Sequence, residues 1–308
     1  MIIGQSPQAM KIKKMIREIS KSDDSALIMG DEGSGKKFVA QAIHQHSRHK
    51  NRPFIVLNCT AVGDTVTEAD LFGEKIEGPL GVERKIGIFE QAKKGFLYLE
   101  NVHELKPDFQ LKLLNILKEK KFQKVGEKTF VEANFRIIAS TTDENLSKKD
   151  TFRKDLLSIL NTFTLIIPPL KKRKQDIPYL FTHFLQEYCA EFGHEIPPVP
   201  AELFESLMEY EWPGNVFELR NAVRNLVLMS PEGTLSIEYL PFEVKRHPFE
   251  ILDDHELPDA VGEIEKYLIR KSLRRFAGNQ SKAARVLNIS EAALRYKMKK
   301  YGLTRKAF

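Results

Sequence analysis

The sequence has 308 residues, of which 42% are hydrophobic and 29% charged, and its formal net charge is +6. This length is sufficient for two or three domains with at least one large core, and the composition is typical of a soluble globular protein. Apolar stretches are too short for a membrane span, a signal-peptide pattern is absent, and the only cysteines are Cys59 and Cys189. These features argue against a membrane protein and a disulfide framework, and they predict a cytoplasmic location.

The positive charge is concentrated at the C-terminal end. Residues 261–308 contain 13 Lys and Arg against 3 Asp and Glu, a net of +10, which leaves −4 on the rest of the chain. A basic tail on a slightly acidic body predicts a polyanionic partner for the tail. Charge alone leaves a solvated basic face as the alternative.

Short apolar runs alternate with helical patterns in the first half of the chain. The runs are nearly continuous, as is typical of strands that are buried on both faces of a parallel sheet. The predicted strands are 26–30, 54–58, 95–100 and 136–140, and the helical segments between them include 36–44 and 109–118. This order predicts an α/β fold with a parallel sheet flanked by helices.

A glycine-rich turn lies between the first predicted strand and the helix that follows it, where "ALIMGDEGSGKK" contains Gly30-x-x-x-x-Gly35-Lys36. This is the Walker A arrangement in its required context, because the glycines let backbone N–H groups face phosphate oxygens and the helix N-terminus adds positive charge. Lys36 is predicted to reach the β- and γ-phosphates of ATP. The alternative is a glycine-rich turn without nucleotide. The predicted nucleotide-binding residues of the loop are Gly30, Asp31, Glu32, Gly33, Ser34, Gly35, Lys36 and Lys37.

Three histidines follow this helix in "HQHSRH", at His44, His46 and His49. Their spacing does not place them on one helical face, so the pattern predicts a surface turn and not a metal site.

The second half of the chain is predicted to be helical. Strand signals stop after 166–170, and the segment from Asp176 to about Ser230 has helical patterns with Pro and Gly at the turns. An irregular stretch, 241–260, is predicted to be a linker, and 261–308 a compact helical unit.

The last part of this unit, 278–303, predicts two helices joined by a tight turn. Asn288 is placed in the turn, where Asn tolerates the left-handed conformation, and Ser290 is a good N-cap for the second helix. The apolar residues predicted on the two helices are Ala283, Ala284, Val286 and Leu287 on the first, and Leu294, Met298 and Tyr301 on the second.

The opposite face of the second helix is predicted to bind DNA, because a recognition helix presents its N-terminal residues to base edges and its basic residues to phosphates. Arg295 and Tyr296 are predicted to contact bases or phosphates. The predicted DNA-binding residues are Lys282, Arg285, Ala292, Arg295, Tyr296, Lys299 and Lys300. A structural helical hairpin is the alternative.

Several motifs together resemble a known family. "GDEGSGKKFVAQAIH", "EADLFG", "GIFEQAKKG", "LLNILKEKKFQKVG" and "WPGNVFELRN" occur in the order found in bacterial enhancer-binding proteins, the sigma-54-dependent transcriptional activators. The resemblance implies an AAA+ P-loop NTPase domain with a helical lid and a C-terminal all-α, Fis-type helix-turn-helix. The implied domains are 1–168 (AAA+ α/β subdomain), 169–240 (lid), 241–260 (linker) and 261–308 (helix-turn-helix). Since the resemblance starts at the first residues, no receiver or sensor domain is expected before it, and the chain is either naturally short or a fragment.

The chain departs from the family at the strand that ends in Asp-Glu, where Asp helps to hold magnesium and Glu orients the attacking water. The matching residues here are Glu100, which keeps the charge and is implied to hold Mg²⁺ through ATP, and Asn101, which cannot accept a proton. General-base catalysis is typically worth about 10²–10⁴ in rate. The alternatives are that Glu100 alone suffices or that Glu104 substitutes. Lys37 follows the Walker lysine where the general motif has a hydroxyl for magnesium, but the family often has Glu there.

Two further catalytic positions of the family are altered. Of two arginines thought to act across the subunit interface, Arg153 is kept, whereas Ile159 occupies the second position. An arginine finger can be worth about 10³–10⁵ in rate. Phe217 stands in place of a sensor arginine, and Arg220, one turn further on, is a candidate substitute at the nucleotide. These losses predict ATP or ADP binding with weak or absent hydrolysis.

The loop that contacts sigma-54 in the family is also altered. The family's GAFTGA motif is replaced by "GPLGV" (78–82), which is shorter and lacks the aromatic residue and the threonine, although Asn58, thought to relay the nucleotide state, is retained. The resemblance therefore does not support productive engagement of sigma-54, whereas RNA polymerase is kept as a partner. The Fis-type unit is implied to pair with itself through 264–273, and the AAA+ domain to form a higher oligomer.

The sequence thus predicts a transcription regulator that binds double-stranded DNA and ATP, and that acts without remodelling sigma-54. One alternative is a working sigma-54 activator driven by ATP hydrolysis. The other is a DNA-binding scaffold that binds no nucleotide.

Overall fold

The structure is a computed structural model that describes residues 2–78, 81–142, 146, 151–230, 234–241, 243–244, 257–276 and 278–303. The chain divides into two compact units. The first comprises Met1–Phe184 and Glu211–Asn221, and the second comprises Leu185–Tyr210 and Ala222–Phe308.

The first unit is built on a five-stranded parallel sheet in the order β2-β5-β8-β1-β9. The strands are β1 (Ala26–Met29), β2 (Phe54–Asn58), β5 (Phe96–Glu100), β8 (Arg136–Thr141) and β9 (Phe163–Ile166). The predicted parallel sheet and its four predicted strands are confirmed. The edge strand β9 was not predicted, because it has only four residues and Thr164 interrupts its apolar run.

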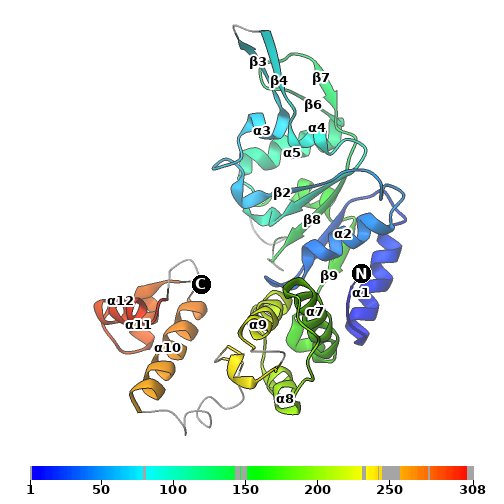
Figure 1. Cartoon of the computed structure of the whole chain (residues 1–308). Coiled ribbons are helices and arrows are strands. Elements are labelled where there is room, and N and C mark those ends of the chain that lie inside the picture. Colours follow the sequence, from blue (N-terminus) through cyan, green and yellow to red (C-terminus); the bar gives the residue numbers. More distant parts are fainter. Residues whose placement is uncertain are drawn as a thin grey trace. The chain divides into compact units, whose positions relative to one another are not determined.

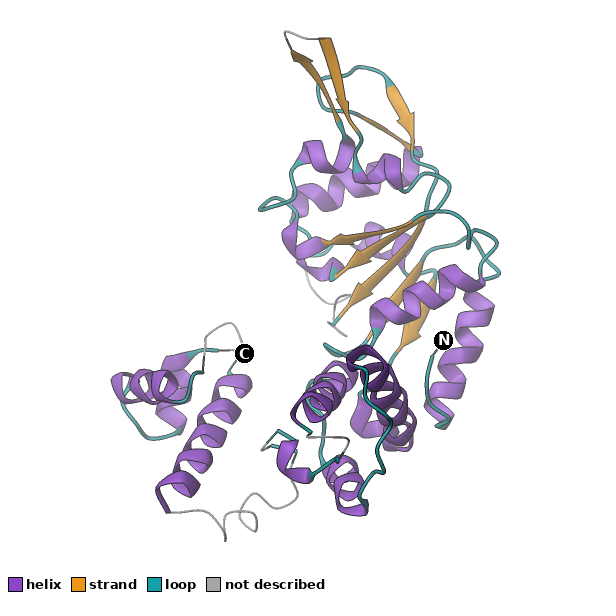
Figure 2. Cartoon of the chain, in the orientation of Figure 1, coloured by secondary structure: helices purple, strands orange, loops and turns teal. Residues whose placement is uncertain are grey.

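Helices cover both faces of this sheet (Figure 2). Successive strand residues point to opposite faces, so Leu97 and Leu99 belong to one core and Phe96 and Tyr98 to the other. The second of these cores is closed by α1 (Pro7–Ile19) and α2 (Lys36–His46), and the first by α3 (Glu68–Phe72), α4 (Ile88–Gln91), α5 (Pro107–Glu119) and α6 (Lys154–Leu160).

Two antiparallel hairpins stand at one end of the first unit, at the top of Figure 1. They are β3 (Glu74–Gly78) with β4 (Gly81–Lys85), and β6 (Lys121–Gln123) with β7 (Phe130–Glu132). The "GPLGV" segment spans the turn of the first hairpin, and residues 79 and 80 lie outside the described residues. Neither hairpin was predicted, since pairs such as Glu74 opposite Lys85 give no apolar alternation.

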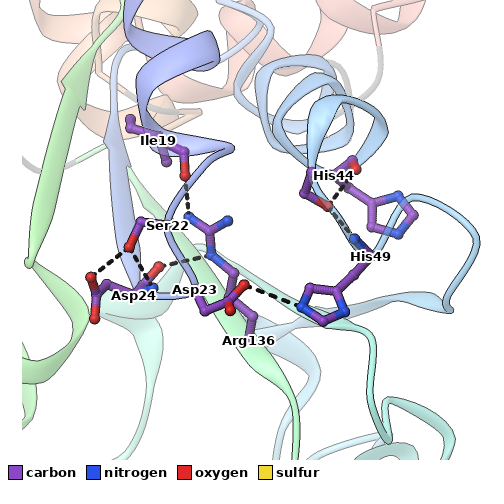
Figure 3. A network of polar contacts seen from close by, with 8 residues as sticks. Ile19, Ser22, Asp23, Asp24, His44, His49 and Arg136 are labelled. Carbon is purple, nitrogen blue, oxygen red and sulfur yellow. Dashed lines mark hydrogen bonds and ion pairs between the residues drawn. The ribbon is translucent and has the colours of Figure 1, made fainter.

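The segment before β1 and the amino end of β8 are joined by a network of polar contacts (Figure 3). Arg136, only 6% exposed, donates from Nε to the Asp24 carbonyl and from Nη2 to the Ile19 carbonyl, both at 2.8 Å. His49 Nε2 lies 3.2 Å from Asp23 Oδ1. These contacts join the loop after α1 to the start of β8 and to the loop after α2.

The predicted surface turn at the three histidines is only partly correct. His44 and His46 lie inside α2, and His44 is buried with Nε2 2.9 Å from the Arg52 carbonyl. His49 follows the helix, as the pattern suggested.

The helices predicted between Asp176 and Ser230 are present, and two of them run from the first unit into the second. They are α7 (Ile177–Phe192), α8 (Ala201–Glu209) and α9 (Asn215–Met229), of which α7 and α9 cross between the units. The 3-10 turns Leu170–Asp176 and Ile237–Tyr239 lie before and after them.

The C-terminal part of the second unit consists of α10 (Leu257–Arg275), α11 (Gln280–Val286) and α12 (Glu291–Lys300). Its core contains Ile269, Leu273, Ala283, Ala284, Leu294 and Met298. The predicted inward stripe of α12 is therefore confirmed, whereas Val286 of α11 is 54% exposed. Among the helices that the structure describes, none has the length and apolar character needed to cross a bilayer.

Candidate functional site

The glycine-rich turn joins β1 to the start of α2, at the carboxyl ends of the parallel strands. Gly33 and Gly35 have φ values of 71° and 101°, which only glycine adopts without strain. A Cβ on Gly33 would lie 2.2 Å from the Gly214 carbonyl oxygen, so glycine is also required there by packing. Gly35 precedes the 11-residue α2 and provides no side-chain cap, so the first N–H groups of α2 are available to an anion.

Two buried polar groups of the turn fit a phosphate ligand. Lys36 is 8% exposed, and its Nζ donates to the carbonyls of Gly30 at 2.8 Å and Asp31 at 2.9 Å. Burial lowers the pKa of Lys36, while the charges of Glu32, Glu100 and Asp31 act in the opposite direction. Ser34 is 4% exposed, and its Oγ has no hydrogen-bond partner within the described part of the chain. An oxyanion at the turn would interact with both groups.

The end of β5 lies beside this turn. Glu100 is half-buried, and its charge is one of those that act on Lys36 against the effect of burial. Glu100 stands opposite Asn58 in the β2–β5 register. Asn101 follows in the left-handed conformation, with φ 56° and ψ 51°, so the chain turns sharply after Glu100.

His103, in the short turn after Asn101, was missed by the sequence reasoning. Its Nδ1 lies 3.0 Å from Thr141 Oγ1, and its Nε2 lies 3.2 Å from Thr142 Oγ1 and 3.3 Å from Glu104 Oε1. The Thr141 carbonyl also accepts the N–H of Gly30 at 3.2 Å. His103 thus connects the ends of β5 and β8 beside the first glycine of the turn. The only signal in the sequence was a histidine close after Glu100.

The two positions that match the family's interface arginines lie on or just before α6. The Arg153 guanidinium contacts Asp155 through Nε–Oδ1 at 3.1 Å and Nη2–Oδ2 at 2.8 Å. This hydrogen bonding raises the pKa of Arg153 and lowers that of Asp155. Ile159 is half-buried against the core that contains Leu97 and Leu99.

The first turn of α9 lies against the glycine-rich turn. The Phe217 N–H donates to the Gly33 carbonyl at 3.1 Å, and the Phe217 side chain is 64% exposed. The Arg220 guanidinium lies 5.9 Å from the centre of the Phe184 ring. The suggested role of Arg220 at a nucleotide stays a prediction.

The predicted DNA-binding side chains gather on α11 and α12. The exposed residues are Lys282, Arg285, Ala292, Arg295, Tyr296, Lys299 and Lys300. Asn288 has φ 53° in the turn between the helices, and Ser290 Oγ accepts the Ala293 N–H at 3.1 Å, so the predicted turn and N-cap are confirmed. Tyr296 is 71% exposed, and Arg295 contacts Glu291 at 3.2 Å.

The sequence matches three family models in chain order. Residues 2–166 match the "Sigma-54 interaction domain", 171–253 the "AAA+ ATPase lid domain", and 260–301 the "Bacterial regulatory protein, Fis family". The first description runs against the expectation that sigma-54 is not engaged.

Known proteins are similar over most of this chain. "Regulatory protein AtoC" of Escherichia coli strain K12 is 35% identical over 98% of this chain and 68% of its own length. The crystal structure of NtrX from Brucella abortus in complex with ADP has a TM-score of 0.72 at 30% identity, covering 98% of this chain and 69% of that one. The NtrX complex with ATP has a TM-score of 0.71 at 30% identity, with coverages of 97% and 69%. The expected AAA+ α/β fold with lid and helix-turn-helix is therefore confirmed, and the chain belongs to the family of bacterial transcriptional regulators that combine a sigma-54 interaction domain of the AAA+ type with a Fis-type DNA-binding domain.

Proposed function

We propose that this regulator binds ATP or ADP at the glycine-rich turn and double-stranded DNA through α12, and that its ATP hydrolysis is weak or lost. The proposal rests on the contrast between intact phosphate-binding residues and an altered catalytic position. The turn, the buried Lys36 and the uncapped α2 are all in place, whereas Asn101 stands where a carboxylate would take the proton of the attacking water. The domain boundaries proposed are those expected from the sequence: 1–168, 169–240, 241–260 and 261–308.

Nucleotide binding is supported from two directions. The turn provides N–H groups, a lysine ammonium and the Ser34 Oγ, which has no hydrogen-bond partner among the described residues, and together these groups suit a di- or triphosphate. The similar NtrX protein has been crystallised in complex with ADP and with ATP. Glu100 would hold the magnesium ion that accompanies the nucleotide, since a carboxylate is the hard oxygen ligand that Mg²⁺ prefers.

Weak hydrolysis is supported by three positions that act on the same step. Asn101 carries no base, Ile159 is packed against the core, and Phe217 offers a ring instead of a cation. Each missing group acts on charge or proton transfer in the transition state, so the three losses reinforce one another.

Contact with sigma-54 and RNA polymerase is proposed on the basis of the family description. What we propose to be missing is the ATP-driven remodelling, because the β3–β4 hairpin lacks the family's aromatic and threonine residues. The regulator would then act by its placement on DNA.

Pairing of two chains through α10 is also proposed. Val261 and Leu268 are 45% and 44% exposed although both are large and apolar, and they lie seven residues apart on one side of α10. A second α10 would cover this stripe, and two recognition helices would then read paired half-sites.

Binding and turnover measured on the same sample test the proposal. Calorimetry with ATP and ADP is expected to show binding, phosphate release is expected to stay near background, and Lys36→Ala is expected to abolish binding. Rapid phosphate release that Lys36→Ala removes would instead identify a working sigma-54 activator. Absence of any binding would identify a nucleotide-free scaffold.

A further inference from the structure

Carbonyl groups of the glycine-rich turn accept hydrogen bonds from residues that are distant in the sequence. Three consecutive carbonyls each accept one hydrogen bond from the segments around 173 and 215–217, which belong to the same compact unit as the turn. The bonds are Asn215 Nδ2 to the Glu32 carbonyl at 2.9 Å, the Phe217 N–H to the Gly33 carbonyl at 3.1 Å, and Arg173 Nη2 to the Ser34 carbonyl at 3.1 Å.

These bonds determine where the N–H groups of the turn point. In a trans peptide the C=O and the N–H point in opposite directions, and the Glu32 carbonyl shares its peptide with the Gly33 N–H. The Ser34 carbonyl likewise shares its peptide with the Gly35 N–H. Fixing the two carbonyls on one side therefore directs the two glycine N–H groups to the other side. Glycine restricts its own backbone conformation very little, so hydrogen bonds from outside the turn are needed to fix the orientation of these peptides.

The two side chains that provide this hold are themselves fixed. Arg173 is 5% exposed, and burial lowers the pKa of its guanidinium, while the charge of the fully buried Asp176 acts in the opposite direction. The Asp176 carboxylate accepts the Ser6 N–H at 2.8 Å and the Ser6 hydroxyl at 2.7 Å. Asn215 is 1% exposed, and its Oδ1 accepts the Leu170 N–H at 2.8 Å. Movement of Asn215 would leave the N–H of the buried Leu170 without this acceptor, and movement of Arg173 would leave the carbonyl of the buried Ser34 without this donor.

We propose that Arg173 and Asn215 are positioning residues of the nucleotide site, which aim the N–H groups of Gly35 and Gly33 at the β-phosphate of an adenine nucleotide. This inference rests on the proposed nucleotide binding and adds to it two residues outside the Walker motif. Both act from behind the turn, so neither needs to touch the nucleotide.

Displacement of a fluorescent ADP derivative by ADP and by AMP tests the inference in the full chain. Arg173→Gln removes the donor to Ser34, and Asn215→Asp removes the donor to Glu32 while keeping the acceptor for the Leu170 N–H. Each change is expected to weaken ADP about ten- to a hundredfold, the usual effect of losing a buried or charge-assisted hydrogen bond. AMP is expected to change much less, because it lacks the β-phosphate. The matched control is Lys172→Gln, which removes the same charge from an exposed neighbour and is expected to leave both affinities unchanged.

The outcomes separate positioning from simple support of the fold. An equal loss for ADP and AMP, accompanied by a lower melting temperature without nucleotide, would mean that the residues only stabilise the unit and would overturn the inference. Unchanged ADP affinity in either folded variant would overturn it as well. If the Arg173 variant does not fold, the nearly isosteric Asn215→Asp decides alone. If the unaltered chain binds no ADP, the proposed nucleotide function fails, and this inference fails with it.

Discussion

Asn101 is the residue on which ATP hydrolysis at the proposed nucleotide site depends most. It directly follows Glu100 and adopts the left-handed conformation, which Asn tolerates better than most residues do. Its amide can hold a water molecule but cannot accept a proton. Under the proposed function, the same residue therefore fits the left-handed backbone and offers no base to the attacking water.

Asn101→Glu is expected to raise phosphate release above that of the unaltered chain, because it restores a carboxylate at the end of β5. The gain should stay below the full 10²–10⁴ or so of general-base catalysis, since Ile159 and Phe217 are unchanged. A left-handed Glu should also cost about 1 kcal/mol of stability, seen as a lower melting temperature. Steady-state phosphate release with Asn101→Ala as the control checks this, and equal rates for the Glu and Ala variants would refute the assigned role.

The helices α10 and α12 are connected by hydrogen bonds to one acidic side chain, Glu265. Glu265 accepts hydrogen bonds from Lys297 Nζ at 2.6 Å and from the Tyr301 hydroxyl at 2.7 Å. The hydrogen bond from Lys297 and that from Tyr301 lower the pKa of Glu265, and the bond to Glu265 raises that of Lys297. The helix α12 is thus held by a polar contact as well as by Leu294 and Met298.

Glu265→Gln is expected to lower the hydrogen-exchange protection of α12 in the full chain at pH 7. Because the folded-state pKa of Glu265 is depressed, its stabilisation is present above the unfolded glutamate pKa of about 4.3 and is lost as the pH falls through the lower folded value. The difference between the variant and the unaltered chain should therefore shrink under acid conditions. The control is Glu291→Gln, whose partner Arg295 is exposed, so its protection should hardly change. A difference that persists unchanged into strong acid would contradict the assignment.

For the whole molecule, the charge distribution separates the two proposed activities. Under the proposed function, the carboxylates whose charges act on Lys36 would be available to the metal ion of a nucleotide, whereas the net +10 of residues 261–308 suits the phosphates of DNA. The chain spans 68% of the length of AtoC.

Salt dependence of DNA binding can separate phosphate contacts from base contacts. Lys299→Gln is expected to reduce the slope of log K against log salt by about 0.9 and to weaken all DNA sequences alike. Arg295→Gln is expected to change the ranking of sequences as well. Lys106→Gln, an exposed lysine of the first unit, is the control and should leave the slope unchanged. A normal slope for Lys299→Gln would remove that residue from the proposed interface.

The features that depend only on neighbouring residues could be predicted from the sequence. The apolar runs 54–58 and 95–100, the turn before Lys36, the left-handed Asn288 and the Ser290 cap are all local patterns, because strand burial, helix capping and positive φ are set within a few residues. The family motifs extended this local reading to the order of the domains.

Contacts between residues that are distant in the sequence became visible only in the folded chain. Arg173 is 139 residues from Ser34, and Asn215 is 183 residues from Glu32, yet both hold the same glycine-rich turn. The contact of His103 with Thr141 and the short edge strand β9 were likewise not readable in advance. A local sequence pattern shows whether a side chain can donate or accept a hydrogen bond, but it does not show which residue is the partner. The partner depends on which strands lie next to each other in the sheet, and here β5, β8 and β1 are neighbours, so their carboxyl ends lie close together.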